Sequence, residues 1–84
     1  MSITLSKEEA EVLKEAAISE NKANLLELEL LSNGRFCLKG SEEVISDLRE
    51  CCGEYLQIVG FDINYEPTSK GKILEYLIDK LDQD

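Results

Sequence analysis

Leucine and glutamic acid alternate over residues 25–31, and this alternation limits the possible folds of the chain more than any other feature. In an extended chain, Leu26, Leu28 and Leu30 point to one side and the two glutamates between them point to the other. A period of two is typical of a strand with one buried and one solvated face. The chain is therefore expected to contain a sheet that is covered on one side only.

A second segment with the same period spans residues 35–39, and the turn-forming sequence Ser-Asn-Gly at residues 32–34 separates the two. A two-residue Asn-Gly loop would pair Leu30 with Cys37 and put the apolar sets of the two strands on opposite faces. A three-residue loop, with its glycine in the left-handed conformation, pairs Leu30 with Phe36 and puts both apolar sets on one face. We therefore predict this second register. The polar face then carries Glu27, Glu29, Arg35, Cys37 and Lys39.

Two of the three predicted helices lie near the ends of the chain. Ser6 can cap the first helix, because Glu9 stands three residues later and completes a capping box. The apolar stripe of that helix ends at residues 21–24. The last helix is expected to begin after Thr68 or Ser69, either of which can act as its cap. The predicted core faces of these two helices consist of Ala10, Val12, Leu13, Ala16, Ala17, Ile73, Leu74, Leu77, Ile78 and Leu81.

The middle helix is predicted to span residues 42–59. Ser41 occupies its capping position, and apolar residues recur at spacings of three and four without a break. Gly53 falls on the polar face, where it costs about 1 kcal/mol relative to alanine but does not disturb the apolar phase. Gly60 is predicted to end the helix in a left-handed conformation.

Two shorter segments complete the predicted fold. Residues 2–5 either form a strand or do not, so the predicted sheet has two or three strands. If they form the third strand, Ile3 and Leu5 point inward. Residues 61–67 are expected to be irregular and to be held down by their alternating apolar side chains. The prediction is one α+β domain over residues 1–84, with three helices on one face of an antiparallel sheet and the element order β-α-β-β-α-α.

The charge of the chain limits its partners. Its 84 residues include 18 acids and 9 bases, which gives a formal net charge of −9. This excess opposes binding to a nucleic-acid backbone, because such binding depends on lysine and arginine, and it favours a partner with a basic surface. No apolar run reaches the roughly 20 residues of a transmembrane helix, and residues 1–7 lack the pattern of a secretory signal. We expect a cytoplasmic protein with no nucleic-acid and no membrane partner.

Groups that commonly perform catalysis are few. Histidine, the commonest general base and metal ligand, is absent. The thiols of Cys37, Cys51 and Cys52 have neither the spacing of a zinc site nor the even number of a disulfide framework. Residues 62–66 begin like a calcium loop, but Pro67 stands in place of its glycine, so a local turn is expected instead. We predict no catalytic residue, no cofactor and no metal, and therefore no enzyme.

The exposed side of the middle helix is expected to be strongly acidic, with only Arg49 of opposite charge. Such a face is either simply solvated or a docking surface for a basic protein, whose association it would accelerate. The candidate partner-binding residues are Glu42, Glu43, Asp47, Glu50 and Glu54.

Motifs in the second half of the chain resemble those of a group of small bacterial proteins without assigned activity. They are Leu48-Arg49, then Leu56-x-x-Val59-Gly60-Phe61-Asp62, and then Tyr65-x-Pro67-Thr68-x-x-Gly71-x-x-Leu74-Glu75-x-Leu77-Ile78-Asp79. The resemblance covers residues 41–81, and such proteins are similar to the small acidic immunity or accessory proteins of bacteria. It implies a protein-binding role and brings no catalytic residues.

Three functional hypotheses remain open. The first is a non-catalytic protein-binding module, such as an immunity-type inhibitor of a basic partner. The second is a homo-oligomeric structural or accessory protein that associates through a sheet face or edge. The third is a winged-helix-like DNA-binding regulator, because residues 65–71 resemble the Y-x-L-T-x-x-G segment of such proteins, although the chain has no basic recognition helix. A cysteine-dependent enzyme stays formally open beside them.

Overall fold

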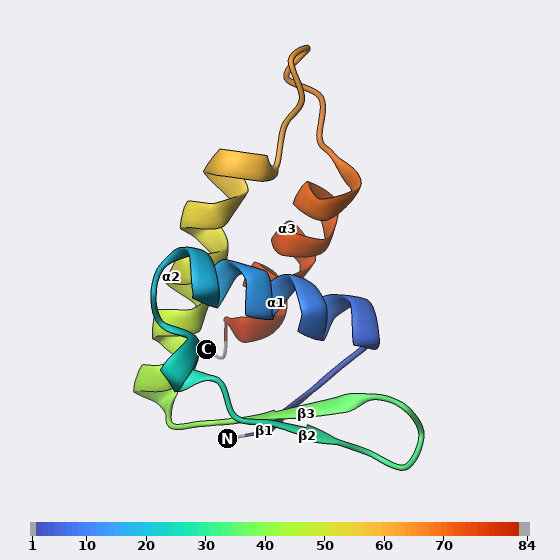
Figure 1. Cartoon of the computed structure of the whole chain (residues 1–84), viewed down its shortest axis with the longest axis vertical. Coiled ribbons are helices and arrows are strands. Elements are labelled where there is room, and N and C mark those ends of the chain that lie inside the picture. The colour runs from blue at the N-terminus through green and yellow to red at the C-terminus, as the bar shows by residue number, and fades with distance from the viewer. Residues whose placement is uncertain (1, 83–84) are drawn as a thin grey trace.

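The structure, a computed structural model, describes residues 2–82 of the chain. Figure 1 shows an α+β fold with the predicted element order, in which a three-stranded sheet lies at one end and three helices lie above it. The elements are β1 (Ser2–Leu5), α1 (Lys7–Ser19), the short 3₁₀ helix η1 (Ala23–Leu25), β2 (Leu28–Leu30), β3 (Phe36–Lys39), α2 (Glu42–Val59) and α3 (Ser69–Leu81).

The sheet is antiparallel with the strand order β1-β3-β2. Leu30 pairs with Phe36, so the register chosen from the apolar pattern is confirmed. The backbone of Leu31 donates a hydrogen bond to the carbonyl oxygen of Arg35, which leaves a three-residue loop, and Gly34 has a positive φ of 83°. The β2 strand is shorter than predicted, because the chain forms η1 before it enters the sheet.

The first strand is present, so the sheet has three strands rather than two. Ile3 and Leu5 point into the core, and their exposed fractions are 8% and 0%. They pair with Leu38 and Phe36 of the central strand. This strand closes the inner face of the sheet against the helices.

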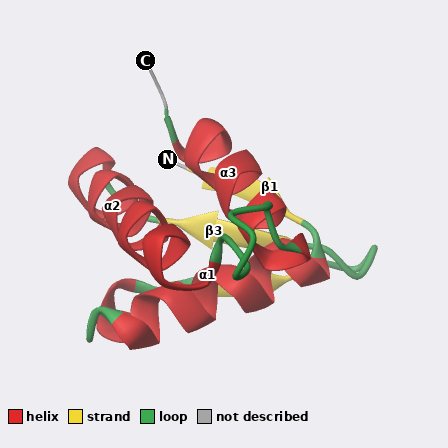
Figure 2. Ribbon diagram, turned by 90° about the horizontal axis from the view of Figure 1, so that it is seen from above, coloured by secondary structure: helices red, strands yellow, loops and turns green. Residues whose placement is uncertain are grey.

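The three helices cover one face of the sheet, as Figure 2 shows from above. Ser6 and Glu9 form the predicted capping box of α1, and Thr68 rather than Ser69 caps α3. The helix α2 has the predicted bounds and the predicted cap at Ser41. The side chains buried between the layers are Ile3, Leu5, Ala10, Val12, Leu13, Ala16, Ala17, Leu38, Ile45, Leu48, Cys51, Cys52, Leu74, Leu77 and Leu81.

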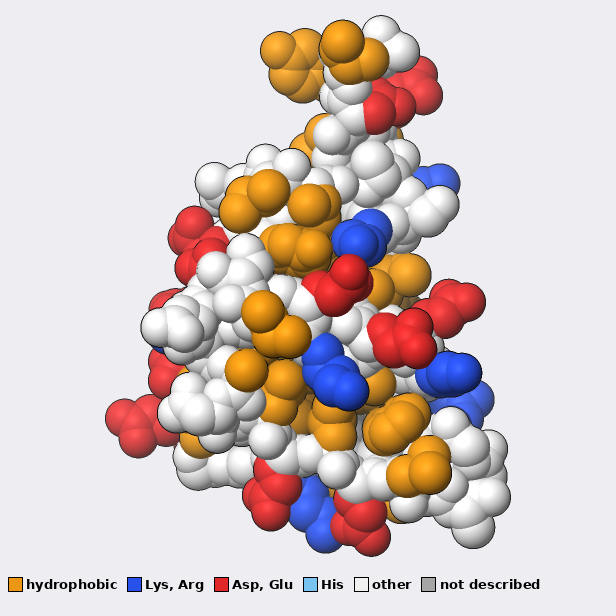
Figure 3. Space-filling view, in the orientation of Figure 1, with side chains coloured by type: hydrophobic (Ala, Val, Ile, Leu, Met, Phe, Trp, Pro, Cys, Tyr) orange, Lys and Arg blue, Asp and Glu red, His pale blue; other side chains and the backbone are white. Residues whose placement is uncertain are grey.

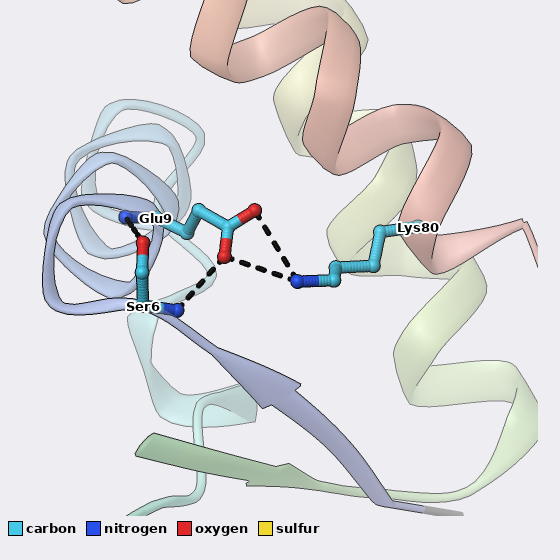
Figure 4. Close-up of polar contacts among 3 residues, drawn as sticks. All are labelled: Ser6, Glu9 and Lys80. Carbon is cyan, nitrogen blue, oxygen red and sulfur yellow. Dashed lines mark hydrogen bonds and ion pairs between the residues drawn. The ribbon is translucent and has the colours of Figure 1, made fainter. Parts of the chain in front are cut away.

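A charged pair joins α1 to α3 beside this core. The Glu9 side chain accepts hydrogen bonds from the backbone of Ser6, at 2.8 Å, and from the Lys80 ammonium group, at 3.1 Å (Figure 4). Burial raises the pKa of Glu9, but the hydrogen bonds from Ser6 and Lys80 outweigh this effect and the pKa is lowered from 4.5. The cap of the first helix therefore also anchors the last one.

The end of α2 differs from the prediction. Gly60 has right-handed angles, φ −74° and ψ −18°, and not the left-handed conformation expected of it. Lack of space explains the glycine instead, because an added Cβ would collide with the side chain and carbonyl group of Leu56. The helix stops where the chain turns toward α3, without a left-handed residue.

The segment of residues 61–67 also differs from the prediction. It forms a narrow hairpin that projects away from the body of the molecule, at the top of Figure 1, and an isolated bridge pairs Phe61 with Pro67. Ile63 and Tyr65 are 92% and 88% exposed, so its apolar side chains do not hold it to the core. Internal hydrogen bonds fix it instead.

Candidate functional site

The predicted acidic residues of α2 separate into a stripe and an outlier. Glu43, Asp47, Glu50 and Glu54 follow one another at spacings of four, three and four, which places them along one side of the helix. Glu42 lies about a quarter turn or more away from this stripe. Asp47 is half-buried and the other four are exposed. Figure 3 shows acidic side chains along the left edge of the molecule, where Figure 1 has α2.

The single base of α2 does not neutralise this stripe. Arg49 points toward the C-terminal end of α3, where its guanidinium group lies 3.6 Å from a carboxylate oxygen of Asp82. Both side chains are partly exposed, so the pair contributes little stability. Its electrostatic effect is to direct the positive charge away from Glu43, Glu50 and Glu54. Arg49 therefore does not offset the charge of the stripe.

Two of the predicted residues line a depression between the end of α1 and the middle of α2. Glu50 and Glu54 line it from α2, and Glu20 lines it from the C-terminal end of α1. Lys22 is the one base in this lining. The depression, called the acidic depression below, has a volume of about 530 Å³ and is lined by Glu20, Lys22, Glu50, Cys51, Gly53, Glu54 and Gln57.

Sequence reasoning missed Glu20 as a member of this site. No local signal marks it, because it lies thirty positions before Glu50 and follows the last apolar residue of α1. The packing of α1 against α2 brings the two carboxylates to the same depression. The geometry thus adds one acid to the predicted set, whereas Glu42 and Glu43 do not line the depression.

The two buried thiols of α2, Cys51 and Cys52, are unsuited to nucleophilic chemistry. Burial raises the pKa of Cys51, and the nearby carboxylates of Glu20 and Asp47 raise it further, while Lys22 acts in the opposite direction. Burial raises the pKa of Cys52 to about 12. Both thiols therefore stay protonated near neutral pH, and the thiolate is the reactive form of cysteine.

The hairpin of residues 61–67, called the tip hairpin below, is the second prominent feature. The backbone of Asp62 donates to the carbonyl oxygen of Glu66, at 2.9 Å. The Asp62 carboxylate accepts from the backbone N–H groups of Asn64 and Glu66, at 2.8 and 3.1 Å, which confirms the predicted local turn. At the base of the hairpin, the Thr68 hydroxyl donates to the carbonyl oxygen of Val59 at 2.8 Å. The tip hairpin is thus a hydrogen-bonded projection that presents apolar side chains to solvent.

Within residues 2–82, no cluster of histidine, cysteine or acidic side chains could hold a metal ion. None of the helices in this part of the chain combines the length and the apolar character needed to cross a bilayer. Comparison with known proteins found no matching family model, no matching curated protein and no matching solved structure.

Proposed function

We propose that this protein is a non-catalytic binding module that takes up a basic protein at its acidic depression, as an immunity-type inhibitor would. One observation carries the proposal: carboxylates from two helices, Glu20 at the end of α1 and Glu50 and Glu54 of α2, line one depression whose lining contains a single lysine. A lysine or arginine side chain of a partner would enter between them. The sequence resemblance to small acidic immunity or accessory proteins agrees with this role.

The fold does not need these carboxylates. Glu20, Glu50 and Glu54 make no ion pair and no side-chain hydrogen bond within residues 2–82, in contrast to Glu9, Glu15 and Glu29, which do. Their charges are therefore available to a partner. Like charges held together by a rigid scaffold also repel one another, and a cation from outside relieves this repulsion. Such a field accelerates association and makes it sensitive to salt.

Two other hypotheses find less support. Binding of DNA depends on lysine and arginine contacts with phosphates, and the net charge of −9 opposes it. A cysteine-dependent enzyme needs an accessible thiolate, and the raised pKa values of Cys51 and Cys52 disfavour that form at two of the three thiols, which leaves only Cys37. Binding of a protein partner requires neither feature.

The test is capture of partners from the native cell by the immobilised protein, with identification by mass spectrometry. The variant Glu20→Gln/Glu50→Gln/Glu54→Gln removes the charge of the acidic depression. The matched control Glu8→Gln/Glu27→Gln/Glu75→Gln removes the same charge from exposed positions elsewhere. We expect a basic protein that the wild type and the control retain at low salt and the depression variant loses by tenfold or more.

The same experiment can contradict the proposal. Equal loss of the captured protein in both triple variants would mean that net charge alone, and not the depression, governs retention. Capture of acidic proteins only, or of nucleic acid, would exclude a basic protein partner. Isothermal titration with the purified partner then measures the affinity of each variant directly.

A further inference from the structure

Two apolar side chains of the tip hairpin are not packed against the core. Ile63 and Tyr65 are almost fully exposed, and Phe61 and the neighbouring Ile58 of α2 are 47% and 65% exposed. The hairpin backbone is held by its own hydrogen bonds and not by these side chains. Exposed apolar groups gathered on a hydrogen-bonded projection indicate an interaction surface. The hairpin sequence also carries two acids, Asp62 and Glu66, and no base.

A groove with the opposite character lies at the other end of the molecule, between α1 and the β2–β3 hairpin. Its floor is apolar and contains Leu26, Leu28 and Phe36, and its volume is about 340 Å³. Lys7 and Lys14 lie at its edge from α1, with Glu11 between them in sequence. We call it the basic groove. Figure 3 shows basic and hydrophobic side chains together in this region, at the lower right.

The two lysines of this groove are not neutralised by an ion pair within residues 2–82, a property that they share with Lys22, Arg35 and Lys72. Lys39, Lys70 and Lys80 each pair with a glutamate, and Arg49 pairs with an aspartate. Lys7 and Lys14 form no ion pair within residues 2–82. In a chain of net charge −9, the basic groove thus combines an apolar floor with an excess of positive charge.

Two other depressions formed by described residues have the wrong charge for the tip hairpin. The acidic depression contains Glu20, Glu50 and Glu54 and would repel it. The depression between α1 and α3 is lined by Glu8, Glu11 and Glu15, and its lysine is already paired with Glu15. An apolar tip that carries two carboxylates is complementary to the basic groove and to neither of these two.

We propose that the tip hairpin of one molecule docks into the basic groove of a second copy. Ile63 and Tyr65 would cover Leu28 and Phe36, while Asp62 and Glu66 approach the two lysines. The tip hairpin lies at one end of the molecule, and β2 and β3, which contribute Leu28 and Phe36 to the groove, lie at the other end (Figure 1), so the contact cannot form within a single chain. Since the two surfaces differ, the contact is head-to-tail and leaves a free tip and a free groove on every dimer, so association continues into chains or rings. This inference does not depend on the acidic depression.

The test is sedimentation equilibrium over a range of concentrations up to about 1 mM, which detects weak self-association. The tip variant is Ile63→Asp/Tyr65→Asp, and the groove variant is Lys7→Glu/Lys14→Glu; all four positions are exposed, and circular dichroism checks that both variants fold. We expect the mass of the wild type to rise with concentration and each variant alone to stay monomeric. An equimolar mixture should form dimers and nothing larger, because only one intact tip and one intact groove can meet.

Two controls separate charge recognition from a general charge effect. The variant Arg35→Glu/Lys72→Glu changes the net charge as the groove variant does, at exposed positions outside the linings of the basic groove and the acidic depression, and it should associate like the wild type. The variant Lys14→Glu/Glu66→Lys exchanges one pair of charges across the contact, keeps the Asp62 hydrogen bonds that hold the hairpin, and should regain association relative to Lys14→Glu alone. A wild type that is monomeric at about 1 mM, or a mixture of tip and groove variants that stays monomeric, would overturn the proposal.

Discussion

Gly71, in the first turn of α3, packs directly on the backbone of Gly60, at the end of α2. A Cβ atom added at Gly71 would lie 2.8 Å from the Cα of Gly60 and closer still to its carbonyl oxygen. The same carbonyl oxygen accepts the backbone N–H of Thr68, the cap of α3. This contact of two glycines sets the approach of α2 and α3 and fixes the base of the tip hairpin.

The first prediction is that Gly71→Ala destabilises the protein by about 1–3 kcal/mol, because the methyl group forces the two backbones apart. The matched control is Gly53→Ala, where an added Cβ meets no atom within 4 Å. Gly53 lies inside α2, so alanine there should stabilise the protein by up to about 1 kcal/mol. Urea unfolding followed by circular dichroism measures both changes. Equal effects of the two substitutions would mean that the glycine contact is not needed.

The second prediction concerns acid stability. The pKa of Glu9 is lower in the folded protein than in the unfolded chain, so its ionised form stabilises the fold above pH 4.5, and this contribution is lost as the pH falls below 4.5. Glu9→Gln should lower the free energy of unfolding at pH 7 by about 1–3 kcal/mol and flatten its dependence on pH between 5 and about 3. Glu29→Gln removes one partner of an exposed ion pair and should not measurably change the free energy of unfolding or its dependence on pH. Thermal unfolding at a series of pH values distinguishes the two variants, and parallel curves for wild type and Glu9→Gln would contradict the assignment.

The third prediction is an order of thiol reactivity. Cys51 and Cys52 are buried and their pKa values are raised, that of Cys52 to about 12, whereas Cys37 lies half-buried on the outer side of the sheet. Iodoacetamide at pH 8 should modify Cys37 first and leave the other two unmodified until the protein unfolds. Peptide mapping by mass spectrometry identifies the site. Labelling of Cys52 at the rate of Cys37 in the folded protein would contradict this order.

The fourth prediction concerns Tyr65, which has a positive φ of 62° although it is not a glycine. This conformation costs a residue with a Cβ about 1–2 kcal/mol, and the 88% exposed ring gains little from packing. Tyr65→Gly should therefore keep or raise the free energy of unfolding, by up to about 1 kcal/mol, although it removes an aromatic side chain. Gly34→Ala, at a φ of 83°, serves as the opposite case and should destabilise the protein. Urea unfolding of both variants measures these changes, and a marked loss of stability in Tyr65→Gly would mean that its side chain does support the fold.

Much of the fold could be predicted because its signals are local. The hairpin register followed from the requirement that Leu30 and Phe36 share a face, and the bounds of α2 followed from its cap and its unbroken apolar phase. Gly34 was predicted correctly because the loop length demanded a left-handed residue. Each of these depends on neighbours in sequence or on the pairing of adjacent strands.

The candidate site was predicted only in part. Glu50 and Glu54 do line a depression, but Glu42 lies off the stripe, and Glu20 was not recognised because only the packing of α1 on α2 brings it there. The predicted left-handed conformation of Gly60 was wrong for a related reason. Its partner, Gly71, is eleven residues away, and a close contact between two helices leaves no periodic pattern in the sequence.

The sequence by itself determined the alternation of strands and helices, the face that each element buries, and the excess of acid. These depend on the direction of each side chain along a strand or helix, which is set by local backbone geometry. Only the tertiary structure decided that the tip hairpin projects with Ile63 and Tyr65 exposed, and that Lys7 and Lys14 flank an apolar groove. Burial and the distance between charges on different elements depend on how those elements pack, and alternating apolar residues predict a buried face only where another element is present to cover it.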